Sequence, residues 1–139
     1  MKQDDELIEK VQKRATKLLS CLRDKHYDER LRILNLTRLD VRRVRGDLIQ
    51  LYKIIHGYDR VVFKNGIPYS KFNYSSRRNV FALNREITKN CSPRYTFFLN
   101  RTVNIWNRLP NEVVTAVNIN SYKAKLDEWI ISNCHSLKG

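Results

Sequence analysis

Residues 37–57 read TRLDVRRVRGDLIQLYKIIHG, and this stretch decides the fold. Its apolar residues recur at steps of three and four, which gathers them on one face of a helix; they are Val41, Val44, Leu48, Leu51, Tyr52 and Ile55. Thr37 and Asp40 have the spacing of a capping box, although Glu or Gln is usual at the second position. Gly57 is the residue type that commonly closes a helix. The sequence therefore predicts a helix here with one face in a core.

The same helix carries a second stripe of arginines, Arg38, Arg42 and Arg45, with Arg43 nearby. A buried helix with a solvated basic rim would show this pattern too. The whole chain, however, has 27 Lys and Arg residues against 14 Asp and Glu, for a net charge of +13. Such a field attracts polyanions, nucleic acid above all, with an anionic membrane surface as the competitor.

Upstream of this stretch, an apolar stripe predicts a helix from Asp4 or Asp5 to about Leu22. The stripe steps by three and four through Ile8, Val11, Ala15, Leu18 and Leu22. Four bases lie mostly off that stripe: Lys10, Lys13, Arg14 and Lys17. A brief helix follows over 28–34, and three helices joined by short turns are near neighbours in space. Residues 4–57 are therefore predicted to form a three-helix bundle whose apolar stripes turn inward.

Downstream, residues 58–108 carry a net charge of +8 and nine Tyr and Phe residues. Bases interleaved with aromatics suit neutralisation of a nucleic-acid backbone together with base stacking. The alternative is that these aromatic residues fill a small core. We expect this for Phe97 and Phe98, and for Tyr69 and Tyr74 both interpretations remain open. Asn65-Gly66 is a strong hairpin signal, so this region is expected to be irregular and able to hold a β-hairpin.

Regular structure is expected to return in a C-terminal helical pair. One helix runs from about residue 95 to Leu109, where Pro110 stops it, and Asn118 or Asn120 starts the other. The fold class is therefore mainly α. Two domains are expected: a bundle over 1–57, and a basic, aromatic-rich segment with a helical extension over 58–139.

No residue pattern points to catalysis, a metal or a cofactor. Three widely spaced cysteines, Cys21, Cys91 and Cys134, argue against a disulfide framework and lack the spacing of a zinc site. His56 falls at a helix end, where an imidazole commonly serves the last carbonyls. No apolar run is long enough to span a bilayer, and the first residues lack the apolar core of a signal peptide. We therefore expect an intracellular protein, nuclear or cytoplasmic, that does not bind a membrane.

Several blocks of the chain are similar to a known family. The first set reads IEKVQKRATK over 8–17, YDERL over 27–31 and RVRGDLIQLYKIIHG over 43–57. The second reads NRTVNIWNRLPNEVV over 100–114, followed by NSYK over 120–123. Together they resemble the region downstream of the polymerase core in non-LTR retrotransposon reverse transcriptases of the jockey and chicken-repeat type. The resemblance covers nearly the whole chain apart from about 58–94.

The resemblance implies a thumb-like helical module and a C-terminal extension that lie against the RNA template and the primer duplex. The family's catalytic aspartate pair lies far upstream of these blocks, and Asp4-Asp5 stand in the wrong context to replace it. The endonuclease domain is missing as well. The fragment is therefore expected not to be an enzyme, with RNA, an RNA–DNA hybrid and the remainder of a reverse transcriptase as partners.

These observations predict a nucleic-acid-binding module with two groups of phosphate contacts. One group comprises Lys10, Lys13, Arg14, Lys17, Arg38, Arg42, Arg43 and Arg45, and the other comprises Arg77, Arg78, Arg85, Lys89, Arg94 and Arg101. Two alternatives remain open. The helices could bury a protein partner's apolar surface, as in a scaffold module, with the bases serving solubility. The chain could also be a decayed retroelement fragment with no selected role.

Overall fold

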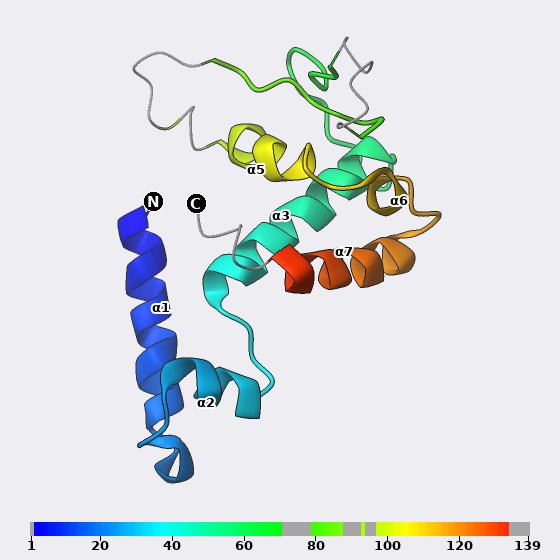
Figure 1. The fold of residues 1–139 in the computed structure, drawn as a ribbon. Coiled ribbons are helices and arrows are strands. Elements are labelled where there is room, and N and C mark those ends of the chain that lie inside the picture. The colour runs from blue at the N-terminus through cyan, green and yellow to red at the C-terminus, as the bar shows by residue number, and fades with distance from the viewer. Residues whose placement is uncertain (1, 71–78, 88–92, 94–96, 134–139) are drawn as a thin grey trace. The chain divides into compact units, whose positions relative to one another are not determined.

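The computed structural model describes residues 2–70, 79–87, 93 and 97–133, and it confirms the mainly α class. The helical elements run α1 (Lys2–Lys17), η1 (Ser20–Leu22), α2 (Tyr27–Ile33), α3 (Leu39–Ile55), α5 (Phe98–Trp106), α6 (Asn111–Val114) and α7 (Ile119–Asn133), as Figure 1 shows. The chain separates into two compact units, 1–44 and 45–139. The boundary thus falls inside α3, whereas the sequence predicted a division after residue 57.

In the first unit, α1 turns its apolar stripe the opposite way from the prediction. Ile8 and Val11 are 55% and 66% exposed, and Leu18, just after the helix, is 86% exposed. Glu9 and Thr16 on the polar side of α1 are buried, and of the predicted stripe Leu22, in η1, is buried. The prediction that the apolar stripe of α1 faces inward was therefore wrong. The physical reason is that the polar side carries the hydrogen bonds that hold this unit together.

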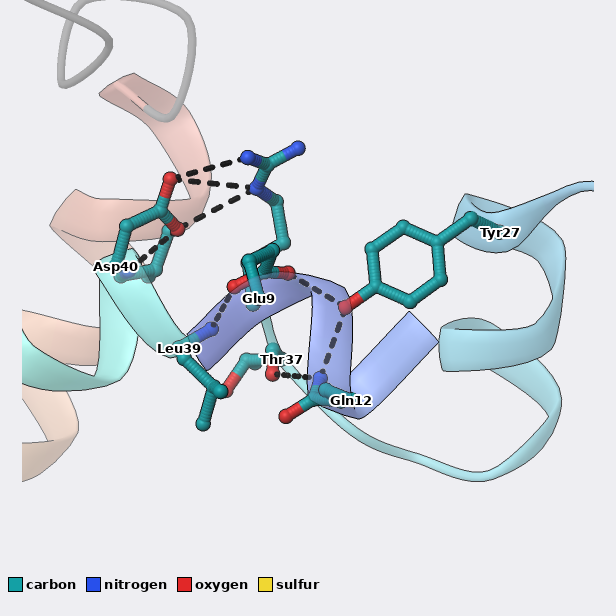
Figure 2. A network of polar contacts seen from close by, with 8 residues as sticks. Glu9, Gln12, Tyr27, Thr37, Leu39 and Asp40 are labelled. Atoms are coloured by element: carbon teal, nitrogen blue, oxygen red, sulfur yellow. Dashed lines mark hydrogen bonds and ion pairs between the residues drawn. The ribbon is translucent and has the colours of Figure 1, made fainter. Parts of the chain in front are cut away.

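Glu9 is the centre of that polar network (Figure 2). Its Oε1 accepts a hydrogen bond from the Tyr27 hydroxyl at 2.5 Å, and its Oε2 accepts one from the Leu39 N–H at 3.0 Å. Gln12 donates to the Thr37 carbonyl at 3.2 Å. Because α3 begins at Leu39, its first unpaired N–H is capped by a carboxylate from α1. The expected capping box of Thr37 and Asp40 was wrong in this respect: Asp40 instead accepts from the adjacent Val41 N–H.

The other end of α3 closes as predicted. Gly57 adopts the left-handed conformation, with φ of 75°. Its N–H donates to the Ile54 carbonyl at 3.3 Å, and the Tyr58 N–H donates to the Lys53 carbonyl at 2.8 Å. This pair of bonds is a Schellman closure, which satisfies two of the last carbonyls of the helix.

The second unit buries the apolar face of α3. Leu48, Tyr52 and Tyr122 have no exposed surface, and the rings of the two tyrosines stack with centroids 4.0 Å apart. The Tyr52 hydroxyl donates to the Ala116 carbonyl at 2.7 Å, and that of Tyr122 donates to the Leu48 carbonyl at 3.1 Å. This part of α3 therefore packs with the C-terminal helices. A three-helix bundle over 4–57, as the sequence predicted, would not include this packing of α3 against the C-terminal helices.

The two expected C-terminal helices are both present. α5 ends at Trp106, and α6 begins directly after Pro110. The Asn118 side chain accepts from the Ser121 N–H at 2.8 Å, so Asn118 is the predicted start of α7. The spacing of Tyr122, Leu126, Trp129 and Ile130 predicts that these four residues of α7 face inward. Tyr122, Leu126 and Ile130 are buried, and Trp129 is half-buried.

A segment without helix, residues 79–87, is fastened to α5 by side chains that bond its backbone. The Asn107 amide bonds Leu83 twice, accepting from its N–H at 2.9 Å and donating to its carbonyl at 2.8 Å. The other bonds join Asn111 to the Val80 N–H, Trp106 to the Phe81 carbonyl and Asn100 to the Glu86 N–H. Four residues of the 100–114 block therefore have a structural role: Asn100, Trp106, Asn107 and Asn111.

The turn expected at Asn65-Gly66 is present, with φ of 72° at Gly66 and its N–H bonded to the Phe63 carbonyl at 3.0 Å. The segment after the turn pairs with 82–84 instead of returning along the segment before it. Tyr69 bridges Leu83 in antiparallel fashion, and the Ser70 N–H donates to the Ala82 carbonyl at 2.8 Å. Within the described residues, this isolated bridge replaces the hairpin.

Candidate nucleic-acid interface

Four predicted phosphate-binding residues lie on α1, and three of them form a row. Lys10, Lys13, Arg14 and Lys17 are all exposed. Steps of three or four residues advance by about one helical turn, roughly 5.4 Å, so Lys10, Arg14 and Lys17 follow one another along one side of the helix. No described acid pairs with these three, and the Lys13 ammonium lies 5.1 Å from the centre of the Tyr27 ring. We call Lys10, Arg14 and Lys17 the α1 row.

The bases at the start of α3 differ in their availability. Arg38 donates to both carboxylate oxygens of Asp40 at 3.3 Å, and this hydrogen bonding raises the pKa of its guanidinium above the ordinary value. Arg42 and Arg43 are exposed. Arg38 therefore already has an acidic partner of its own, which a phosphate would have to displace.

A hollow of about 320 Å³ in the first unit shows why charge alone does not define an anion site. Three bases line it, Lys10, Lys13 and Arg38, but so do the acids Glu6, Glu9 and Asp40. Opposite charges in one hollow largely cancel its attraction for a polyanion. Lys10 of the α1 row lines this hollow, whereas Arg14 and Lys17 lie outside it, so the row extends beyond the acids.

Two other predicted phosphate ligands connect helices in the second unit. Arg45 Nε and Nη2 bond the Asp127 carboxylate at 2.6 and 2.9 Å, which joins α3 to α7. Arg101 Nε and Nη2 bond the Asp47 carboxylate at 2.7 and 2.8 Å, which joins α5 to α3. Such two-pronged pairs are the strongest geometry an arginine makes with a carboxylate. The structure thus gives Arg45 and Arg101 a role within the fold.

The remaining predicted bases are divided between described and undescribed parts of the chain. Arg77, Arg78, Lys89 and Arg94 lie outside the described residues. Arg85 is described and half-buried, and it lines a hollow of about 420 Å³ in the second unit. We call this the 63–100 hollow, and its walls are residues 63–66, Pro68, residues 84–86, Phe97, Leu99 and Asn100.

Phe97 was expected to fill a core, and that expectation was wrong. Its side chain is 54% exposed at the start of α5 and lines the 63–100 hollow, while Phe98 is half-buried. Tyr69, left open by the sequence, is 44% exposed, and Tyr74 lies outside the described residues. In the sequence, the interleaving of bases and aromatics indicated this region as a candidate for nucleic-acid binding. It could not show that residues 63 and 97, far apart in sequence, line one hollow.

Tyr27 offers a titration test of the Glu9 network. Burial, followed by the hydrogen bond to Glu9, raises the pKa of Tyr27 from 10.0 to about 12. Since the folded state then holds this proton more tightly than the unfolded state, stability should fall as pH rises from about 10 to 12. The stability difference between the native chain and Tyr27→Phe should therefore narrow over that range. Urea unfolding followed by far-UV circular dichroism measures it, and a constant difference would contradict the assignment.

The described residues also bear on metal binding, on the histidine and cysteine side chains and on membrane spanning. In those ranges, no group of three or more His, Cys, Asp or Glu side chains is placed to hold a metal. His56 Nε2 lies 2.9 Å from the Val114 carbonyl, and Cys21 is an exposed free thiol. No described helix has the length and apolar character needed to cross a membrane.

Comparison of the chain with protein-family models, with curated proteins and with solved structures gives no match.

Proposed function

We propose that the chain is a non-catalytic nucleic-acid-binding module that grips the backbone of RNA or of an RNA–DNA duplex. The observation that carries this proposal is the α1 row, three exposed cations that pair with no acid among the residues that the structure describes. The net charge of +13 adds long-range attraction for a polyanion. The resemblance of the sequence blocks to non-LTR reverse transcriptases makes a thumb and C-terminal extension the proposed origin, with the rest of such a polymerase as a further partner.

The test is a binding titration of the full chain against single-stranded RNA, RNA–DNA hybrid and duplex DNA at several chloride concentrations. The variant Lys10→Gln, Arg14→Gln, Lys17→Gln removes the α1 row. It should lower affinity for single-stranded RNA about tenfold or more at physiological salt. It should also reduce the slope of log affinity against log salt by about 2, because each lost phosphate contact contributes about 0.7.

A matched control removes three exposed bases that lie outside the predicted contacts: Arg23→Gln, Arg32→Gln and Arg60→Gln. This variant has the same net charge as the first. It should bind within about threefold of the native chain, since it keeps the row. Equal losses in the two variants would reduce the interaction to general attraction between opposite charges and would overturn the proposal.

One observation favours the second candidate function, a protein-interaction module. The apolar stripe of α1 is exposed, and it includes Leu7 and Leu19 at 54% and 45% as well as the three residues described above. Large exposed apolar patches mark interaction sites in soluble proteins. Under this alternative, the Lys10, Arg14, Lys17 variant keeps its protein partner and the native chain shows no salt-dependent binding of nucleic acid.

A further inference from the structure

We propose that the 63–100 hollow of the second unit binds one unpaired base of a single-stranded nucleic acid, together with its phosphate. This inference rests on the proposed function and deepens it by naming a second site with a different kind of contact. Whereas the α1 row recognises backbone charge, this site recognises a base that is free of its complement.

The walls of the hollow provide ring surfaces. Phe63 and Phe97 both line it, with Pro68 and Leu99 adding apolar surface. Phe97 is 54% exposed even though it stands at the start of a helix, so its ring is accessible to a ligand. Stacking of a base on an aromatic side chain contributes about 1–3 kcal/mol per base and tolerates any sequence.

Two polar side chains at the rim are available to a ligand. The Lys64 ammonium and the Asn65 amide are exposed and make no bond within the described residues. Asn84 donates from its amide nitrogen to the Tyr69 carbonyl at 3.2 Å, which leaves its amide oxygen to accept. An ammonium suits a phosphate, and amides suit the edge of a base, which presents donors and acceptors only when the base is unpaired.

The size and support of the hollow agree with a small, rigid ligand. Its volume of about 420 Å³ falls within the range of roughly 300–1,000 Å³ that small-molecule sites occupy. One wall, residues 84–86, is held in place by the bond from the Glu86 N–H to Asn100 at 3.1 Å and by the bond from the Asn84 N–H to the Pro68 carbonyl at 2.7 Å. A peptide could use the apolar surface, but two bases, Lys64 and Arg85, line the hollow against one acid, Glu86. This excess of positive charge, with the net charge of the chain, favours the anionic ligand.

The experiment compares the full native chain with Phe97→Ala. The probes are a twelve-nucleotide uridine RNA, the same strand carrying one central 2-aminopurine, and a blunt twelve-base-pair RNA duplex. Phe97→Ala should weaken binding of both single strands about tenfold and leave duplex affinity within about twofold, since paired bases cannot enter the hollow. The 2-aminopurine fluorescence should be quenched on binding to the native chain, and less so with the variant.

Two variants keep the result interpretable. Phe97→Trp retains a ring and should bind single strands at least as well as the native chain. Ile87→Ala removes a side chain that is 89% exposed and lies outside the hollow, and it should have no effect. Circular dichroism confirms that each variant folds.

The inference is overturned by unchanged single-strand affinity in Phe97→Ala, by an equal loss for the duplex, or by fluorescence that does not respond to binding. If the α1 row variant weakens all RNA while Phe97→Ala does not, the base site fails and the proposed function stands. If the native chain binds none of the RNAs, both fail. Binding of hydrophobic peptides in preference to RNA would assign the hollow to a protein partner and overturn the inference.

Discussion

Replacing Asn107 with alanine should lower the free energy of unfolding of the second unit by about 2–4 kcal/mol. The reason is that the backbone N–H and carbonyl of Leu83 would both lose their hydrogen bond to the Asn107 amide. Asn107 accepts from the Leu83 N–H and donates to its carbonyl, and Leu83 is 1% exposed. Water cannot readily replace the amide at such a position. The variant should unfold at a lower urea concentration than the native chain. The unfolding transition is measured by the fluorescence of Trp106 and Trp129, which both belong to this unit.

Asn104 provides the matched control, since it is an exposed asparagine of α5, three residues before Asn107, and its side chain makes no bond within the described residues. Asn104→Ala should change stability by no more than about 0.5 kcal/mol. Asn107→Asp should also destabilise, because it places a carboxylate oxygen against the Leu83 carbonyl. Equal stabilities of Asn107→Ala and Asn104→Ala would show that the segment 79–87 is not fastened in this way.

Replacing Glu9 with alanine should destabilise the first unit by about 2–4 kcal/mol, since one buried carboxylate serves two donors. The Tyr27 hydroxyl and the Leu39 N–H would both lose their acceptor, and α3 would lose the charge that favours its N-terminus. Because neither tryptophan lies in this unit, the measurement is amide hydrogen exchange. The Leu39 N–H should exchange much faster in the variant.

Glu6→Ala is the control for that experiment. Glu6 lies one turn earlier on α1, is exposed and makes no bond within the described residues, so its loss should leave exchange at Leu39 unchanged. Glu9→Gln should fall between the two, because a glutamine offers one oxygen where the carboxylate offers two. If Glu9→Ala protects Leu39 as well as the native chain does, the capping role is wrong.

The sequence predicted features that depend on neighbouring residues. The left-handed closure at Gly57, the start of α7 at Asn118 and the turn at Asn65-Gly66 follow from local backbone chemistry, and all three are present. The buried face of α7 also follows from its periodicity. Each of these requires knowledge of only one element.

The features that the sequence missed depend on contacts across long separations. The stripe of α1 has the period of a core-facing helix, yet burial goes to Glu9 because its partners, Tyr27 and Leu39, come from other elements. Likewise, Arg45 and Arg101 look like free cations in the sequence, and only the folded chain brings Asp127 and Asp47 to them. Periodicity reports which residues share a face, but it does not report what that face meets.

The unusual orientation of α1 has a practical consequence for solution work. Its sixteen residues carry a cationic row and an uncovered apolar stripe on one short rod, and these two sides respond to added salt in opposite directions. Sodium chloride screens the cations, while sulfate and phosphate also strengthen association of the apolar side chains. Titrations with chloride therefore report mainly on the charges, whereas sulfate buffers would favour clustering of the protein through its uncovered helix.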